Sequence, residues 1–480
     1  MATGAMRRVA RWVVALGVGA SAAVATACGS SAGDSPGSGD GDGGSSGAPG
    51  PDSSAGGDAQ GGATEMDAAH TGGDGGKGPS HADAGADAAT SGHPDGSLAS
   101  SSSGAAGQSL FTIPLTTTSD SFVYEAELTI GDQTFAMDID TGSTTIAVAA
   151  ATCASCTGIT PKYTPTTGVD QLTPATSQYQ DGSGWSGEIY RDTVTLAHGT
   201  PSVSLNFSTI TSQTQFFEDN AYQGILGLGS VFNADTDTDA YLAMVEAKGV
   251  APVTSFELCD TSGTMWLGGY DAAAANGAPT YTPMLAINDN NPFYSLDVDD
   301  LKLGGTSLGY QTSSDFQEPI VDTGTSLFYL PTGIFKTMLD TIKASSGFEA
   351  LFPGQALTSE GCVQTPGVTD AMLDAQLPAM TIDFPSTTSG APDVTLTATA
   401  SQSYFYDNGN GQFCLAIGNG GTSDASTLGL TFLRAFVTII DTGNGRIGFA
   451  PDLGCAAGGG MRVVHPRAWP PRPRPPRGRR

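Results

Sequence analysis

The chain carries the tripeptide Asp-Thr-Gly twice, as Asp140-Thr141-Gly142-Ser143 and as Asp322-Thr323-Gly324-Thr325. Each copy follows a short apolar run, Phe135-Ala136-Met137 before the first and Pro319-Ile320-Val321 before the second. A run of this kind ending in a turn is typical of a strand that presents a polar side chain at its end. The two copies lie 182 residues apart, which predicts two similar lobes that each contribute one carboxylate.

Two carboxylates that share a site can divide acid and base work between them. Because both cannot ionise readily, one keeps its proton while the other stays charged. The charged group can take a proton from water, and the protonated group can polarise a peptide carbonyl. Gly142 and Gly324 allow tight turns, and the hydroxyls of Ser143 and Thr325 can hydrogen-bond the carboxylates. One Asp-Thr-Gly alone is an ordinary turn, but two copies in matching contexts indicate catalysis.

Composition limits the class of protein. At 480 residues the chain is too long for one ordinary core, which favours two domains or two lobes. Its formal net charge is −29, and ten of its 19 Lys and Arg residues lie before residue 12 or after residue 461. The remaining chain is strongly acidic and repels nucleic acid, so no nucleic-acid partner is expected. Its self-repulsion eases at low pH, which suits a protein that works in acid.

The N-terminus is typical of an export signal. Three arginines precede an apolar run from Trp12 to Val24, which is too short to span a bilayer. Ala25-Thr26-Ala27 fits a cleavage site and Cys28 follows it directly, which resembles a bacterial lipoprotein signal. We therefore expect a signal peptide over residues 1–27 and a lipid anchor on Cys28 that holds the exported protein at a membrane or cell surface. Ordinary secretion is the alternative.

Three further segments follow from composition. Residues 29–107 are rich in Gly, Ser, Ala and Asp and cannot form a core, so we predict a disordered tether over residues 28–107. Beyond Cys455 the chain is rich in Pro and Arg, which predicts a disordered tail over residues 456–480, with an electrostatic anchor as the alternative. The folded body then divides into an N-terminal lobe over residues 108–272 and a C-terminal lobe over residues 273–455.

The body has the pattern of a mostly antiparallel β protein. Short alternating runs broken by Gly, Asn and Pro predict strands that include residues 122–130, 193–197, 203–207 and 294–303. Helical patterns are few and short, near residues 240–248, 331–343 and 370–376. Gly224–Gly229 follows the first Asp-Thr-Gly, and Thr427-Leu428-Gly429 follows the second. This indicates an internal repeat with a glycine where two chain segments cross closely.

Residue counts exclude several kinds of chemistry. Residues 108–455 contain one histidine, His198, which excludes Ser/His and Cys/His nucleophiles and the usual His-containing zinc sites. No glycine-rich loop followed by Lys-Ser or Lys-Thr opens a helix, so a phosphate-binding loop is not expected. We expect neither a cofactor nor a metal. Without Cys28 the chain has six cysteines, an even set that suits disulfides in an oxidising compartment.

These residues resemble the pepsin-like family of aspartic endopeptidases, and the resemblance covers residues 108–455. Two segments of this chain, Ile139–Ser143 and Val321–Ser326, look like the two active-site loops of that family. Its flap, a β-hairpin that closes over the substrate, looks like Tyr179–Ser183, and its last strand looks like Arg446–Pro451. The resemblance implies an all-β, bilobal fold with a central cleft and few short helices.

The resemblance also implies a role for each matching residue. Asp140 and Asp322 are the implied catalytic pair, and Thr141, Ser143 and Thr323 the implied hydrogen-bond support. The implied substrate-binding and flap residues are Tyr179, Asp181, Gly182, Gly142, Gly324 and Thr325. The implied reaction is hydrolysis of extended polypeptides at acidic pH by a monomer. The alternative is a catalytically weak pepsin fold that serves as a binding or inhibitory surface lipoprotein.

The chain departs from the family in its flap support. Members usually carry a Trp seven residues after the first catalytic Asp, where this chain has Ala147. We therefore expect the Tyr179 hydroxyl to lose its usual partner, although Trp185 is a candidate substitute if it does more than pack. Asp138, two residues before Asp140, has counterparts in some fungal members.

Three disulfides are expected in the body. Cys153 and Cys156 would close a very small loop, and Cys362–Cys414 looks like the bridge of the family's second lobe. The surroundings of Cys259 and Cys455 resemble plant members, in which such a pair joins the central sheet to the C-terminus.

Overall fold

The computed structural model describes residues 109–453, except for 118–122, 180–181, 198, 218–221, 232–236, 261, 289–290, 311–317, 359–360, 365, 408–411 and 422–425. The predicted signal peptide, tether and C-terminal tail lie outside the described residues, as do Cys28, Asp181 and Cys455. Within the described part of the chain, no helix has the length and apolar character needed to cross a membrane.

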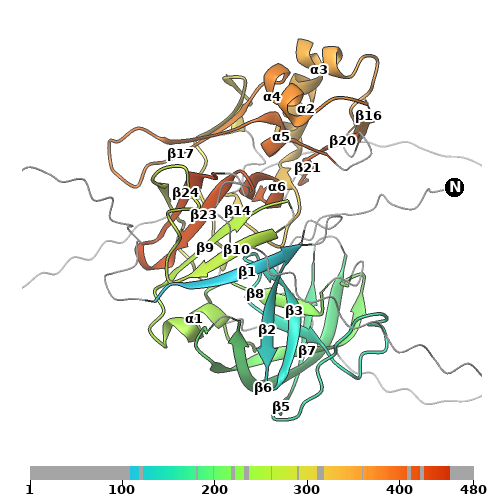
Figure 1. Cartoon of the computed structure of the whole chain (residues 1–480), viewed down its shortest axis with the longest axis vertical. Helices are drawn as coiled ribbons and strands as arrows, with labels where there is room; N and C mark the ends of the chain where they lie inside the picture. The colour runs from blue at the N-terminus through green and yellow to red at the C-terminus, as the bar shows by residue number, and fades with distance from the viewer. Residues whose placement is uncertain are drawn as a thin grey trace, which may run out of the picture. The chain divides into compact units, whose positions relative to one another are not determined.

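A large mixed sheet links the two halves of the body (Figure 1). It has 13 strands, which are in sheet order β11 (Thr280–Pro283), β24 (Arg446–Pro451), β23 (Phe436–Asp441), β9 (Val253–Leu258), β10 (Ser262–Leu267), β1 (Phe111–Thr117), β2 (Tyr124–Ile130), β3 (Gln133–Asp140), β8 (Gly224–Gly227), β4 (Ile146–Ala149), β7 (Val203–Thr214), β6 (Gly184–Leu196) and β5 (Val169–Gln178). The first strand of the body and its last strand therefore belong to one sheet. This sheet also crosses the lobe boundary predicted after residue 272.

Three smaller sheets lie in the described part of the C-terminal lobe. One contains β14 (Ile320–Val321), β22 (Thr427–Leu428), β15 (Phe328–Leu330) and β21 (Ile417–Asn419). The second contains β13 (Thr306–Ser307), β12 (Asp300–Leu303), β17 (Met380–Phe384) and β18 (Val394–Ala398). The third contains β16 (Cys362–Gln364), β20 (Gln412–Leu415) and β19 (Phe405–Asp407). The described fold is thus mostly β, as the sequence predicts.

The predicted internal repeat is confirmed by the strand pairing. In the first half β3 pairs parallel with β8, β8 antiparallel with β4, and β4 parallel with β7. In the second half the same pattern joins β14, β22, β15 and β21. A Cβ on Gly227 would lie 2.5 Å from the Thr145 nitrogen, and one on Gly429 would lie 2.2 Å from the Leu327 oxygen. Both crossings therefore require a residue without a side chain.

Short helices pack around this framework. The three expected helices are confirmed as α1 (Tyr241–Glu246), α2 (Thr332–Ala344) and α4 (Asp370–Gln376). In α2 the buried side chains recur at helical spacing: Ile334, Phe335, Met338, Leu339 and Ile342. Among the described residues, three more α-helices and a short 3-10 turn were not predicted: α3 (Ser346–Leu351), α5 (Ala400–Ser403), α6 (Leu430–Leu433) and η2 (Thr442–Asn444).

One predicted strand is wrong in its length. Only Asp300–Leu303 of the expected 294–303 strand is regular, as β12. Ser295 bridges to Ile320, whereas Leu296 bridges to Met284, so neighbouring residues take different partners. The alternating pattern reports burial on one face, but it does not require a single partner strand along its whole length.

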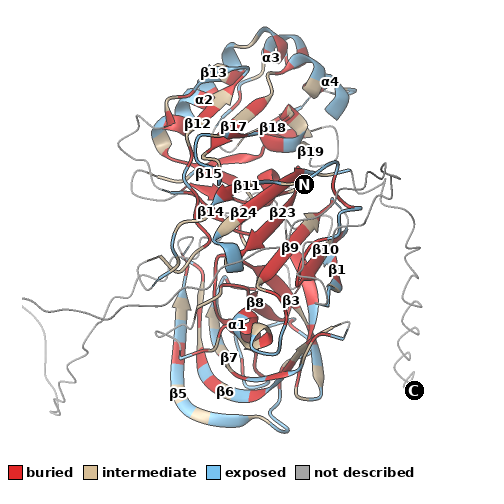
Figure 2. Ribbon diagram, turned by 90° about the vertical axis from the view of Figure 1, so that its left-hand side faces the viewer, coloured by how far each residue is buried: buried red, intermediate tan, exposed pale blue. Residues whose placement is uncertain are grey.

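The central strands of the large sheet and the outer hairpin strand β5 differ in how far they are buried. Figure 2 shows β9 and β23 almost entirely buried, whereas the long strand β5 is largely exposed. The strands that lead to the two Asp-Thr-Gly turns are also buried, since the last four residues of β3 and both residues of β14 have little exposed surface. The hairpin strand β5, in contrast, faces solvent along most of its length.

Candidate active site

Both aspartates lie on turns at strand ends, as predicted. Asp140 is the last residue of β3, and Asp322 directly follows β14. The backbone N–H of Gly142 donates to Asp140 Oδ1 at 2.7 Å, and that of Gly324 donates to Asp322 Oδ1 at 2.8 Å. Each turn therefore fixes its own carboxyl group by the same hydrogen bond.

Each carboxyl group also lies against the glycine of the opposite turn. A Cβ on Gly142 would stand 2.6 Å from Asp322 Cγ, and one on Gly324 would stand 2.5 Å from Asp140 Cγ. Neither glycine is among those with positive φ. The sequence-based reason given for these glycines, freedom to turn, is therefore incomplete, because the close approach of the two halves is what excludes a side chain.

Two threonines join the turns in a reciprocal network. The Thr141 hydroxyl donates to the Val321 carbonyl at 2.8 Å and accepts from the Thr323 N–H at 3.0 Å. The Thr323 hydroxyl donates to the Ile139 carbonyl at 2.9 Å and accepts from the Thr141 N–H at 3.1 Å. Because both side chains are fully buried, water cannot replace these bonds. The network fixes the position of one aspartate relative to the other.

The two carboxyl groups have different electrostatic surroundings. Burial raises the pKa of Asp140 well above its ordinary value, and the charges of Asp322 and Asp138 raise it further. Burial also raises the pKa of Asp322, but the Thr325 hydroxyl, which donates to Asp322 Oδ2 at 2.6 Å, opposes that rise. The hydrogen bond between the two carboxyls raises the pKa of Asp140 and lowers that of Asp322. These surroundings favour the protonated form more strongly at Asp140 than at Asp322.

Ser143 is less well placed than its counterpart Thr325. Within the described part of the chain its buried Oγ makes no close hydrogen bond, although the hydroxyl still lowers the pKa of Asp140. The expected symmetry of the two hydroxyls is therefore only partial, and the stronger support falls on Asp322.

The flap residues form the tip of the hairpin between β5 and β6. The Tyr179 N–H donates to the Ser183 carbonyl at 2.9 Å, and the Gly182 N–H donates to the Tyr179 carbonyl at 3.0 Å. Gly182 has φ of +83°, a conformation that favours glycine.

The Tyr179 side chain has a partner that the sequence suggested only as a candidate. The Trp185 Nε1–H donates to the Tyr179 hydroxyl at 3.0 Å, and the Tyr179 ring stacks on Phe216 with ring centroids 5.5 Å apart. Ala147 is fully buried in the same apolar cluster. The expectation that the tyrosine loses its partner is therefore wrong, because the indole comes from the flap's own returning strand. Phe216 was missed, since only the fold brings it under the flap.

The described cysteines are all disulfide-bonded. Cys153 is bonded to Cys156, and Cys362 to Cys414, which lies directly opposite it on β20. Cys259 is also in a disulfide, and its partner lies outside the described residues. These disulfides fit an extracellular protein.

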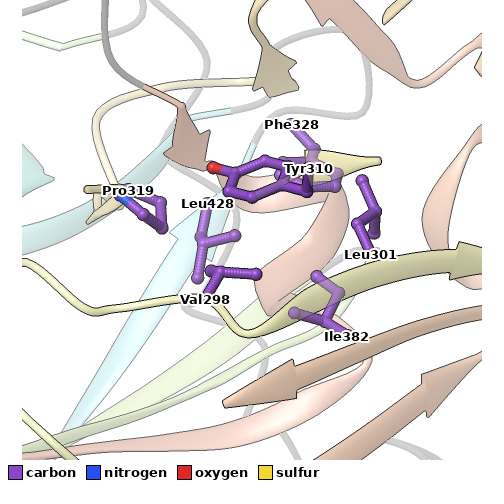
Figure 3. Close-up of a pocket in the computed structure, with 7 residues that line it drawn as sticks. All are labelled: Val298, Leu301, Tyr310, Pro319, Phe328, Ile382 and Leu428. Carbon is purple, nitrogen blue, oxygen red and sulfur yellow. The ribbon is translucent and has the colours of Figure 1, made fainter. Parts of the chain in front are cut away.

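A small apolar cavity lies beside the strands that lead to Asp322. Figure 3 shows its lining by Val298, Leu301, Tyr310, Pro319, Phe328, Ile382 and Leu428. The lining includes neither aspartate, and its one titratable side chain, Tyr310, is hydrogen-bonded to the Ser426 hydroxyl. The cavity is therefore a feature of the lobe's core and not part of the carboxyl site.

Comparison with known proteins agrees with this geometry. Residues 123–452 match the family described as eukaryotic aspartyl protease. The chain is 31% identical to an aspartic protease of Phaffia rhodozyma over 69% of this chain and 76% of that protein. It is 29% identical to aspergillopepsin-1 of Aspergillus oryzae over 69% of this chain and 80% of the relative. It is 27% identical to a beta-secretase of Strongylocentrotus purpuratus over 68% of this chain and 66% of the relative.

A mostly β fold of two repeated halves, with one buried aspartate on each, defines the class of aspartic hydrolases. The chain belongs to the eukaryotic aspartyl protease family, which is pepsin-like. It is an aspartic-type endopeptidase.

Proposed function

We propose that the protein hydrolyses extended polypeptides at acidic pH by activating one water molecule between Asp140 and Asp322. The Asp322 carboxylate takes a proton from the water as its oxygen attacks the peptide carbonyl carbon. Asp140 gives its proton to the carbonyl oxygen, which produces a tetrahedral diol. The diol collapses when Asp322 returns a proton to the amide nitrogen and the C–N bond breaks. Asp140 regains its proton from the diol hydroxyl.

One observation carries this proposal: two buried carboxyls lie against each other's turns in unequal electrostatic surroundings. Equal groups would compete for the proton, whereas unequal groups divide the acid and base roles before substrate arrives. Thr325 supports the anionic role of Asp322, because its hydroxyl donates to Asp322 Oδ2 and lowers the pKa of that carboxyl.

We assign substrate contact to the flap and to the two turns. Tyr179, Asp181 and Gly182 would close over an extended peptide, and Gly142, Gly324 and Thr325 would contact it beside the carboxyls. The Gly182 turn supports this assignment, since no atom of the described residues would lie within 4 Å of a Cβ placed there. The substrate is a polypeptide, the enzyme acts as a monomer, and no cofactor takes part.

A purified 108–455 fragment tests the proposal on denatured protein substrate between pH 3 and 6. We expect cleavage that Asp140→Asn and Asp322→Asn each abolish, with kcat falling by on the order of 10³ or more. A matched Asp132→Asn variant, at the exposed turn between β2 and β3, controls for loss of an aspartate elsewhere. Near-native activity of either dyad variant would refute the shared-proton mechanism. The rival binding module loses its main support, because Tyr179 has a partner in Trp185.

We also propose that the exported protein is anchored through acylated Cys28. The sequence of the signal region and the six remaining cysteines support this. Full-length wild type should partition with membranes, whereas a Cys28→Ala variant should be released. Soluble wild type with an unmodified Cys28 would indicate ordinary secretion.

A further inference from the structure

The sheet face that carries Asp140 also carries two carboxyls that the proposed mechanism does not use. The apolar side chains of β3 lie in the hydrophobic core, so Asp138 and Asp140 share the opposite face. Glu125 of β2 is the direct partner of Asp138 in the antiparallel register. Opposed residues of this kind have Cβ atoms about 5 Å apart on one face. We call Glu125, Asp138 and Asp140 the acidic row.

The acidic row is buried throughout. Glu125 is 9% exposed and Asp138 is 2% exposed. Among the described residues, the Oε1 atom of Glu125 has no hydrogen-bond partner. Burial raises the pKa of Glu125 to about 7, so this side chain is neutral in acid. Asp138 bears on the dyad directly, because in its ionised form its charge raises the pKa of Asp140.

The neighbours of the row come from four sides among the described residues. On β1 the residue opposite Glu125 is Thr116, and on β8 the residue opposite Asp138 is Ile225. The C-terminal half contributes Asp322, which couples to Asp140. Arg434 approaches β2 at the preceding residue, where it donates to the Tyr124 hydroxyl at 2.8 Å and pairs with Asp260. On β2 itself, Glu127 lies on the same face as Glu125 and is exposed.

We propose that the acidic row keeps Asp140 protonated as the pH rises, with Asp138 supplying the charge and Glu125 placing a neutral carboxyl beside it. This inference rests on the proposed dyad mechanism. Residues two apart on a strand lie about 7 Å apart, and at that distance a buried negative charge favours the neutral form of its neighbour. Asp138 is thus a positioning residue that extends the upper pH limit of activity without touching the reacting atoms.

The pH dependence of kcat/KM tests the inference. In Asp138→Asn the upper limb of the profile should move to lower pH by about 1 unit, since the lost charge releases the proton of Asp140 earlier. Activity just above the wild-type limb should fall about tenfold, while the acid limb stays in place. Asp138→Glu should restore the limb. Glu127→Gln is the matched control, because water screens its exposed charge and the profile should not change.

An upper limb that stays in place in Asp138→Asn, or moves to higher pH, would overturn the inference, even if overall activity falls. If that variant does not fold, carbon-13 NMR titration of the aspartate carboxyls in the wild type tests the inference instead, because it reports the protonation state of each carboxyl. Asp138 that remains charged while Asp140 loses its proton supports the inference, and a neutral Asp138 overturns it. Failure of the proposed function has a separate signature, namely peptidase activity that survives Asp140→Asn or Asp322→Asn.

Discussion

The Trp185 indole donates a hydrogen bond to the Tyr179 hydroxyl at 3.0 Å, and both residues belong to the same hairpin. A flap whose tyrosine is held from within the hairpin carries its support along when it moves. Support from residue 147 on β4 would instead tie the flap to the body of the lobe.

Trp185→Phe keeps the apolar packing of the ring and removes its N–H. The Tyr179 hydroxyl then loses a bond worth about 1 kcal/mol, so the flap is less ordered before binding. We expect KM and the pepstatin inhibition constant to rise about fivefold, while the pH profile keeps its shape. Steady-state kinetics at several pH values measure both. Unchanged inhibition would show that the Phe216 stack alone orders the tyrosine.

Ala147→Trp should not improve the enzyme. Ala147 has no exposed surface, and its carbonyl oxygen would lie 2.2 Å from a Cβ on Gly224. An indole there overpacks the cluster and should lower stability by about 1–3 kcal/mol. Thermal unfolding measures this, with Ala147→Ser as the small control. Tighter pepstatin binding by Ala147→Trp would contradict the assignment of flap support to Trp185.

Thr325→Ala removes the hydroxyl that donates to Asp322 Oδ2. That hydroxyl lowers the pKa of Asp322, so its loss raises the pKa. Activity requires Asp322 ionised, and the acid limb of the kcat/KM profile should therefore move to higher pH by about 1 unit. Thr325→Ser keeps the donor and should retain the wild-type limb. An acid limb that does not move in Thr325→Ala would show that another group sets the ionisation of Asp322.

Thr141→Val breaks the network between the two turns. The Val321 carbonyl and the Thr323 N–H then lose a buried partner, at a cost of about 1–3 kcal/mol each. Both the midpoint temperature of thermal unfolding and kcat should fall, because the two aspartates are no longer held in a fixed position relative to each other. Thr141→Ser should retain most of both quantities. A fall in stability at unchanged kcat would separate the network from catalysis.

Glu257 predicts how stability depends on pH. Burial, followed by the charge of Asp452, raises its pKa from 4.5 to about 7. Below pH 4.5 the Glu257 carboxyl is protonated in both the folded and the unfolded state, so the stability of the fold is fully present. As the pH rises towards 7 the unfolded state loses this proton more readily, and the free energy of unfolding falls. Glu257→Gln should therefore unfold at a higher temperature than the wild type at pH 8 and at a similar one at pH 4. Equal differences at both pH values would refute the linkage.

Peptide mapping tests the remaining disulfide. We predict that Cys259 pairs with Cys455 and that neither is alkylated without prior reduction. Closing this long loop should stabilise the fold by up to about 4–5 kcal/mol in the chain-entropy account. A Cys455→Ser variant should expose an alkylatable Cys259 and unfold at a lower temperature. Alkylation of Cys259 in the unreduced wild type would exclude the pairing.

The sequence predicted the elements whose pattern is local. The two turns and helix α2 depend on neighbouring residues, and each was found where it was expected. Relationships across strands were not predictable, because a sequence does not give the register. The opposition of Glu125 to Asp138 and the stack of Phe216 under Tyr179 are of this kind. The regular part of residues 294–303 was overestimated for the same reason, since consecutive residues there bridge to different partners.

The sheet that joins the first strand of the body to its last has a consequence for biosynthesis. Strand β9 lies between β10 and β23, and β24 is bracketed by β23 and β11, so the sheet is incomplete until Pro451 has been made. Pairing over such sequence distances is slow and comes late in folding. A nascent chain thus holds both aspartates long before it has a scaffold to align them. We therefore expect the two carboxyls to become aligned only after β24 has been synthesised.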